Sequence, residues 1–202
     1  MKLKVCGMHH NVAAVAEINP DYLGFIFYGK SARNFTLDTI ETPKSIKRVG
    51  VFVDEAYETI LEKIKQFDLQ LIQLHGSESP ERCRDLRKKG VAVIKVFSIK
   101  DRFDFSRLAP YEPVVDYFLF DTKGELPGGN GFAFDWQVLQ EYPSTVPYFL
   151  SGGIGLDQLE KLAQFLASDA AKYCHAIDVN SKFEIEPGLK QIEQLELFKS
   201  KL

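Results

Sequence analysis

The chain has 202 residues, 45% hydrophobic and 26% charged, which is typical of a folded globular protein and excludes a disordered or collagen-like chain. Lysine plus arginine number 25 and aspartate plus glutamate 28, and the net charge of −3 argues against binding to nucleic acid or to an anionic membrane. The three cysteines form no CxxC or Cys/His metal spacing, and no apolar run has the length of a signal peptide or a membrane span. We therefore expect a cytoplasmic protein without disulfides or a zinc site.

Eight short apolar runs follow one another along the chain and predict β-strands. They occupy residues 2–6, 22–27, 46–52, 69–74, 92–97, 117–120, 147–150 and 175–179. Runs such as GFIFY, VGVFV and LQLIQL carry large apolar side chains on both faces. This pattern favours strands of a parallel sheet that is covered on both sides.

Amphipathic segments alternate with these runs and predict helices. One has an apolar stripe within residues 56–67, with Asp54 as its expected N-cap, and another within 156–166. A closing helix is expected to open at Pro187-Gly188 and to continue to Phe198. Weaker patterns predict helices over 11–18, 37–42, 80–89 and 134–140, and a short one within 103–109.

Eight strand–helix units in 202 residues average about 25 residues each, near the lower limit for a (β/α)₈ TIM barrel. The alternative is a doubly wound open sheet, which predicts a GxGxxG turn after the first strand. The first strand is followed instead by Cys6-Gly7-Met8. We therefore expect an α/β protein that forms one barrel domain over residues 1–202.

Polar residues follow the predicted strands at the end where barrel enzymes bind substrate. Cys6 ends the first strand and Asp121 the sixth, and a thiol with a carboxyl group across a barrel mouth can act as base and acid. A thiol has a pKa of about 8.5 and needs a positive neighbour to act as a base near neutrality. At this point the alternative stays open that Cys6 is simply a small buried hydrophobe. The other polar candidates are Arg33, Gln73, His75 and Asp178.

Glycine-rich and small residues form a second group of candidates. Gly152-Gly153 follows the seventh strand and Asn180-Ser181 the eighth, the positions where barrel enzymes commonly hold a phosphate with backbone N–H groups. A tight turn without a ligand is the alternative reading of the two glycines. The segment Gly128-Gly129-Asn130-Gly131 after the sixth strand predicts a mobile loop over the barrel mouth.

Together these motifs resemble the phosphoribosylanthranilate isomerase family. The resemblance covers nearly the whole chain, and the order of the motifs carries it. They are KVCGM at 4–8, GFIFYGKSAR at 24–33, VGVFVD at 49–54, LIQLHG at 71–76, LFDT at 119–122, GGNGFAFDW at 128–136, SGGI at 151–154, and AIDVNSKFE followed by PGLK across 176–190.

The resemblance implies an Amadori rearrangement of N-(5'-phosphoribosyl)anthranilate to 1-(2-carboxyphenylamino)-1-deoxyribulose 5-phosphate in tryptophan biosynthesis, without a cofactor or metal. It implies that Asp121 is the general acid, that Cys6 is the base as a thiolate, and that Arg33 pairs with the anthranilate carboxylate. The remaining implied roles are substrate contacts for Gln73, His75 and Asp178, and a phosphate cradle of Gly152, Gly153, Asn180 and Ser181. The expected partner is this small phosphorylated substrate alone, and the expected assembly is a monomer or a small homo-oligomer.

Six positions depart from the commoner family pattern: His9, His10, Asn130, Ala176, Asn180 and Lys182. A cradle built on backbone N–H groups tolerates Asn180, and Lys182 would add positive charge beside a phosphate. Two alternatives stay open: another sugar-phosphate isomerase or epimerase barrel, and an inactive barrel that serves as a binding module. The histidine-pathway isomerase would carry a carboxylate at the position of Cys6, and an inactive barrel would be expected to have lost Cys6, Asp121 or Arg33.

Overall fold

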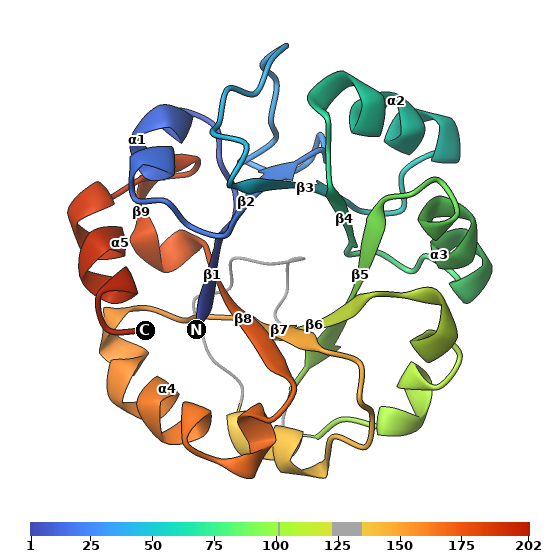
Figure 1. Cartoon of the computed structure of the whole chain (residues 1–202), viewed down its shortest axis with the longest axis vertical. Helices are drawn as coiled ribbons and strands as arrows, with labels where there is room; N and C mark the ends of the chain where they lie inside the picture. The colour runs from blue at the N-terminus through green and yellow to red at the C-terminus, as the bar shows by residue number, and fades with distance from the viewer. Residues whose placement is uncertain (101, 123–134) are drawn as a thin grey trace.

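The computed structural model describes residues 1–100, 102–122 and 135–202. Eight parallel strands pair in chain order and form a closed barrel, which Figure 1 shows as a ring of strands surrounded by helices. Strand β1 pairs with β8, so that Lys4 lies opposite Asp178, and this pairing closes the ring. The strands are β1 (Lys2–Val5), β2 (Tyr22–Ile26), β3 (Lys47–Phe52), β4 (Leu71–Leu74), β5 (Ala92–Ile99), β6 (Tyr117–Thr122), β7 (Tyr148–Leu150) and β8 (Cys174–Val179).

Helices and a short hairpin cover the outside of the ring. The α-helices are α1 (Val12–Glu17), α2 (Tyr57–Phe67), α3 (Pro80–Arg87), α4 (Leu159–Leu166) and α5 (Ile192–Lys199). Short 3₁₀ helices cover the barrel elsewhere, at Phe105–Leu108, Glu112–Val114, Trp136–Glu141, Leu156–Gln158, Asp169–Ala171 and Ser181–Phe183. An antiparallel hairpin of β9 (Glu184–Glu186) and β10 (Leu189–Lys190) follows β8.

The apolar core has two parts, as expected when strands are buried on both faces. The larger part lies between the strands and the surrounding helices, where Trp136 packs edge-on against Phe165. The smaller part fills the inside of the barrel. Its buried members come from successive strands: Tyr22, Val49, Leu71, Ile94, Val96, Leu119, Phe149 and Ala176.

The predicted strand–helix alternation is confirmed, but four details are corrected. Residues 37–42 form no helix, because Asp, Thr and Ile are weak helix formers and Pro43 disfavours helical backbone at the residue before it. Strands β5 and β6 each extend two residues beyond the predicted ends at 97 and 120, because they pair with each other as far as Ile99 and Thr122. The helix expected at 134–140 is a 3₁₀ helix from Trp136, and residue 134 lies outside the described residues.

Two expected helix starts are also wrong. Asp54 does not cap α2, since its side chain accepts a hydrogen bond from the Ser77 backbone N–H and ties the β3–α2 loop to the β4–α3 loop. The closing helix begins at Ile192 instead of Pro187. Gly188 has a φ of +87° and makes the turn between β9 and β10, so the residues before Gln191 form a hairpin.

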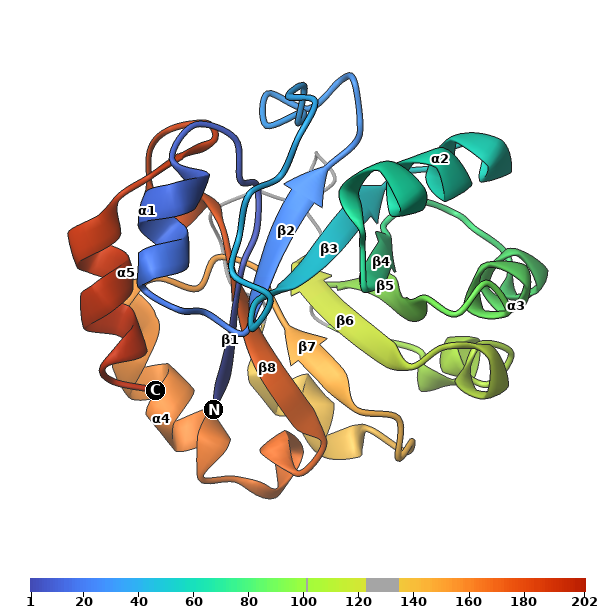
Figure 2. The same ribbon diagram turned by 45° about the horizontal axis from the view of Figure 1, so that its top comes forward.

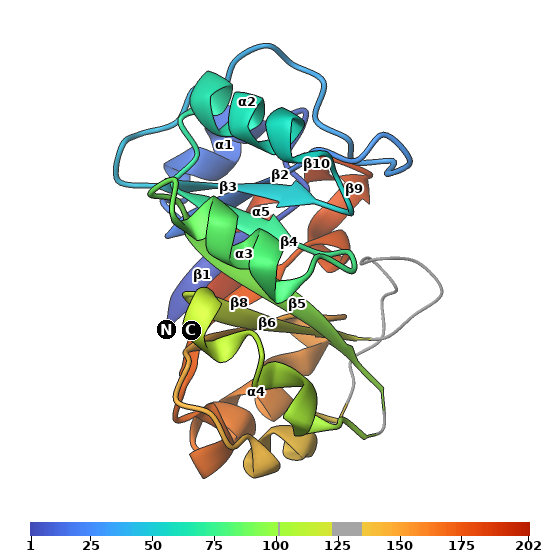
Figure 3. The same ribbon diagram turned by 90° about the vertical axis from the view of Figure 1, so that its right-hand side faces the viewer.

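The two ends of the barrel differ. Both chain termini lie side by side at the end where the barrel strands begin (Figures 2 and 3). The β9–β10 hairpin lies at the opposite end, where the strands finish. Within the described ranges, no helix has both the length and the apolar character needed to cross a membrane.

Candidate active site

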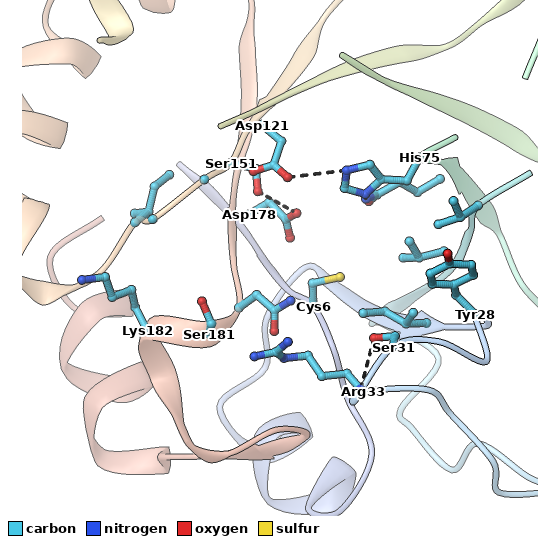
Figure 4. Close-up of a pocket in the computed structure, with 18 residues that line it drawn as sticks. Cys6, Tyr28, Ser31, Arg33, His75, Asp121, Ser151, Asp178, Ser181 and Lys182 are labelled. Carbon is cyan, nitrogen blue, oxygen red and sulfur yellow. Dashed lines mark hydrogen bonds and ion pairs between the residues drawn. The ribbon is translucent and has the colours of Figure 1, made fainter. Parts of the chain in front are cut away.

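One pocket opens at the carboxyl ends of the barrel strands and gathers the predicted site residues (Figure 4). Each predicted catalytic, substrate-binding and phosphate-binding residue lines it: Cys6, Arg33, Gln73, His75, Asp121, Gly152, Gly153, Asp178, Asn180 and Ser181. Tyr28, Ser31, Ser151 and Lys182 line it as well. The predicted mobile loop, Gly128, Gly129, Asn130 and Gly131, lies outside the described residues.

Strand β1 and the residue after it direct a cation and a thiol into the barrel. Lys4 and Cys6 are two residues apart, so their side chains point to the same face of the strand. Lys4 is fully buried and Cys6 is 5% exposed. Gly24 of β2 leaves room for the thiol, because a Cβ atom at this position would lie 2.8 Å from the Cys6 Sγ.

The groups around Cys6 have opposite effects on the pKa of its thiol. Burial raises the pKa of the Cys6 thiol above its ordinary value of 9.0, and the nearby Asp178 carboxylate also raises it. Lys4 and Lys190 act in the other direction and lower the pKa. Burial prevails, so the thiol of the ligand-free protein keeps its proton at neutral pH.

Asp121 lies on β6 with its side chain almost fully buried in the pocket. Burial raises its pKa to about 7, and the charge of Asp178 adds to this effect. A hydrogen bond from the Thr122 backbone N–H, 2.9 Å from Oδ1, and the charge of Lys4 limit the rise. With a pKa this close to neutrality, the Asp121 carboxyl can hold or release its proton near neutral pH.

Gln73 and His75 lie on and after β4 and present polar atoms to the pocket. Burial, with the charges of Lys95 and Lys4, lowers the pKa of His75 to about 4, so the ring is neutral. Its Nε2 is 3.5 Å from the Asp121 Oδ2, beyond a good hydrogen bond. Within the described part of the chain, neither this Nε2 nor the Gln73 Oε1 has a hydrogen-bond partner, although both atoms are buried.

Asp178 is buried on β8 and bridges two neighbours. Its Oδ1 accepts a hydrogen bond from the Lys4 Nζ at 2.8 Å, and its Oδ2 accepts one from the Ser151 hydroxyl at 3.3 Å. Burial raises the pKa of Asp178, while Lys4 opposes the rise. Lys4 thus stands between the Asp178 carboxylate and the Cys6 thiol, and both of these groups contribute to raising its own pKa.

The Arg33 guanidinium enters the pocket from the loop after β2 (Figure 4). Its Nε and Nη2 hold the Glu184 carboxylate at distances of 2.7 to 3.0 Å. Glu184 also accepts a hydrogen bond from the Lys190 Nζ at 2.7 Å. The sequence analysis did not identify Glu184, Lys190 or Lys4, and only Lys4 gave a signal there, as a cation two residues before Cys6 in an otherwise apolar strand.

The glycine turn after β7 has a backbone that only glycine adopts readily. Gly152 and Gly153 have φ angles of +92° and +67°, and a Cβ at Gly152 would lie 2.6 Å from the Thr122 backbone nitrogen. Asn180 uses its side-chain oxygen to accept a hydrogen bond from the Lys190 Nζ at 2.8 Å. Both loops line the pocket, with Gly152 and Gly153 from one and Asn180 and Ser181 from the other.

A closed parallel barrel with a buried thiol, a buried carboxyl and a glycine turn at its carboxyl end has the architecture of a (β/α)₈-barrel enzyme. The family model described as N-(5'phosphoribosyl)anthranilate (PRA) isomerase matches residues 3–201. The chain belongs to this family and is an isomerase of tryptophan biosynthesis. The resemblance found in the sequence and the expected barrel are thereby confirmed.

Relatives and solved structures agree with this assignment. N-(5'-phosphoribosyl)anthranilate isomerases of Parabacteroides distasonis and Phocaeicola vulgatus are each 43% identical, over 98% and 100% of this chain and 91% and 98% of theirs. The Thermus thermophilus enzyme has a TM-score of 0.82 at 27% identity, covering 100% of this chain and 98% of its own. A phosphoribosyl anthranilate isomerase in complex with reduced 1-(o-carboxyphenylamino)-1-deoxyribulose 5-phosphate has a TM-score of 0.80 at 28% identity, covering 100% and 97%.

Proposed function

We propose that this chain rearranges N-(5'-phosphoribosyl)anthranilate with Asp121 as general acid and Cys6 as general base. The observation that carries the proposal is the entry of a buried thiol from β1 and a buried carboxyl from β6 into one pocket. We also propose that this chain acts on the substrate for which the family is named and carries out the same rearrangement. It requires no cofactor or metal.

The reaction begins with a proton that Asp121 gives to the furanose ring oxygen. The bond between this oxygen and C1' breaks, and the nitrogen lone pair forms the C1'=N bond of a protonated Schiff base. The Cys6 thiolate then removes the proton from C2', and the enolamine that results tautomerises to the ketose. After this step the proton is on the Cys6 sulfur and the negative charge is on Asp121.

The two raised pKa values support this direction of proton flow. The reactive pair has a protonated Asp121 and a deprotonated Cys6, whereas the ligand-free pKa values favour the reverse. Proton abstraction therefore returns the pair to its more stable arrangement. Lys4 and Lys190 lower the pKa of Cys6 and so increase the population of the reactive form.

Arg33 would bind the anthranilate carboxylate, because a guanidinium matches a carboxylate with two parallel hydrogen bonds. Backbone groups of Gly152, Gly153, Asn180 and Ser181 would hold the phosphate. The unpartnered Gln73 Oε1 and His75 Nε2 are suited to substrate polar groups. Asp178 would contact the substrate from β8 beside Ser151.

We further propose a single domain over residues 1–202 in the cytoplasm, acting on this small phosphorylated molecule and not on nucleic acid or membranes. The expected state is a monomer or a small homo-oligomer; the Thermotoga maritima relative is a dimeric enzyme of which monomers have been generated. Sedimentation equilibrium tests this expectation. A large assembly would contradict it.

The test is the fluorescence decay of freshly generated N-(5'-phosphoribosyl)anthranilate after addition of the purified protein. Wild type should remove the substrate without added metal or cofactor, and C6A and D121N should each be slower by at least ~10²-fold, since each lacks a positioned base or acid. C174A is the matched control, because Cys174 begins β8 outside the pocket and its loss should leave turnover unchanged. Full turnover in folded C6A would refute the base assignment.

A further inference from the structure

The hairpin that follows β8 brings a carboxylate to the pocket arginine. Glu184 begins β9, and its side chain is 4% exposed. Its two oxygens accept three contacts from the Arg33 Nε and Nη2, at 3.0, 2.8 and 2.7 Å. No barrel strand supplies this carboxylate, so it lies outside the set of strand-end residues from which barrel sites are built.

Glu184 is itself firmly fixed. Its Oε1 accepts a hydrogen bond from the fully buried Lys190 Nζ at 2.7 Å and another from the Gly188 backbone N–H at 3.1 Å. Burial alone would raise the pKa of Glu184, but the hydrogen bonds from Arg33 and Lys190 prevail and lower it below its ordinary value. The group is therefore a carboxylate at neutral pH, held from three directions.

The contact geometry leaves part of Arg33 for a ligand. A guanidinium has five N–H donors, and the pair with Glu184 uses the Nε–H and an N–H of Nη2. Among the described residues, Nη1 makes no hydrogen bond, and Arg33 lines the pocket with a side chain that is 18% exposed. The long arginine side chain would otherwise lose much conformational freedom each time it bound a carboxylate.

We propose that Glu184 is the positioning residue of the substrate-carboxylate site: it fixes the Arg33 guanidinium so that its free edge faces the anthranilate ring. The inference rests on the proposed role of Arg33. Glu184 contacts no reacting atom and acts on the substrate carboxylate through Arg33. Its loss should therefore weaken recognition of the carboxylate and leave the chemical step nearly intact.

The experiment compares two ligands that differ in the carboxylate. One is reduced 1-(o-carboxyphenylamino)-1-deoxyribulose 5-phosphate, which carries carboxylate and phosphate, and the other is ribose 5-phosphate, which carries phosphate only. In E184Q the Kd of the first ligand should rise about tenfold, the order expected from ordering one long side chain, and that of the second by less than about twofold. With substrate, KM should rise about tenfold while kcat stays within about threefold.

The matched control is D116N. Asp116 forms another arginine–carboxylate pair of this type, with the Arg87 Nε and Nη2 at 3.2 and 2.9 Å, outside the pocket. Its loss should change neither Kd. If E184Q does not fold, E184D is used, which keeps the charge on a shorter side chain and should show the same selectivity with a smaller rise.

Equal weakening of both ligands in the Glu184 variant would overturn the proposal, since it would mean that Glu184 supports the phosphate side through Lys190 and Asn180. An unchanged Kd for the carboxylate ligand would overturn it too. R33A separates this failure from failure of the proposed function. If R33A weakens the carboxylate ligand selectively and the Glu184 variant does not, only the inference about Glu184 fails; if R33A is not selective, the role proposed for Arg33 fails.

Discussion

The Asp121 carboxyl and the Cys6 thiol both have raised pKa values and lie in the same barrel mouth. The number of protons that the two groups hold together determines at which pH the site can react. Asp121 titrates at about 7 and Cys6 above 9. Above about pH 7 the pair holds one proton, mainly on sulfur, and the reactive arrangement holds the same single proton on the carboxyl. The fraction of molecules with a protonated Asp121 and a deprotonated Cys6 is therefore constant between the two pKa values.

We accordingly predict a plateau in the pH profile of kcat/KM. Below about pH 7 both groups are protonated and no base is present, so activity falls; above the pKa of Cys6 both have lost their protons and no acid is present, so activity falls again. The measurement is kcat/KM from pH 5 to 10 at low substrate concentration. In D121N the limb near pH 7 should vanish, and the residual activity should rise with the ionisation of Cys6. A wild-type profile that already declines just above pH 7 would contradict the placing of the upper pKa above 9.

At the scale of residues, the sequence predicted the two reacting groups but not the charged residues that contact the site. Cys6 and Asp121 follow from their positions at strand ends and from motif order. The contacts of Lys4 with Asp178, and of Glu184 with Arg33 and Lys190, join residues far apart in the chain. The sequence does not show which of its charged side chains pair inside the protein, because most charged side chains lie in solvent.

At the scale of elements, β2 makes room for the side chain that follows β1. The glycine of GFIFY at Gly24 faces Cys6, and a Cβ there would lie 2.8 Å from the sulfur and 3.1 Å from the Cys6 Cα. Distances this short require the neighbour to move. The position of the Cys6 side chain thus depends on a glycine, which has no side chain, at Gly24 in the adjacent strand.

We predict that G24A reduces kcat at least ~10-fold and lowers the free energy of unfolding by about 1–3 kcal/mol, because added atoms in a packed core displace their neighbours. Steady-state kinetics and chemical denaturation measure the two effects. G29A is the control, since Gly29 is exposed, has no atom within 4 Å of an added Cβ, and should behave as wild type. Equal kinetics in both variants would show that Cys6 does not depend on Gly24.

The order of elements was predictable because apolar runs and amphipathic stripes report burial directly. The predicted helix starts that were wrong depend on contacts between segments that are separate in the sequence. Asp54 has the residue type of an N-cap, but its carboxylate bonds to Ser77 in the next loop. The spacing of Leu189 within the closing helix pattern is real, yet pairing of β9 with β10 places that residue in a strand.

At the scale of the molecule, the pairing of β1 with β8 makes the first and last strands neighbours. Every barrel strand then has two partners, and loss of any one opens the ring. A ring of this kind favours cooperative unfolding, because partial structures leave unpaired strand edges.

We therefore expect one unfolding transition in guanidinium chloride. Far-ultraviolet circular dichroism follows the whole barrel, and the emission of Trp136, the one tryptophan of the chain, follows packing between the 3₁₀ helix at Trp136–Glu141 and α4. The two curves should coincide, as two-state unfolding requires. Separate midpoints would contradict a single cooperative domain.

Because the two chain ends are neighbours, we expect that the barrel can form from a chain in which the strands follow one another from a different starting point. A short glycine–serine linker from Leu202 to Met1 would cross the end of the barrel opposite the pocket (Figure 3). New ends opened at the exposed turn of Gly90, between α3 and β5, would leave all eight strand pairings available. Such a circular permutant should keep both the fold and the catalytic pocket, so the arrangement of the strands in space, and not their order along the chain, is what the activity needs.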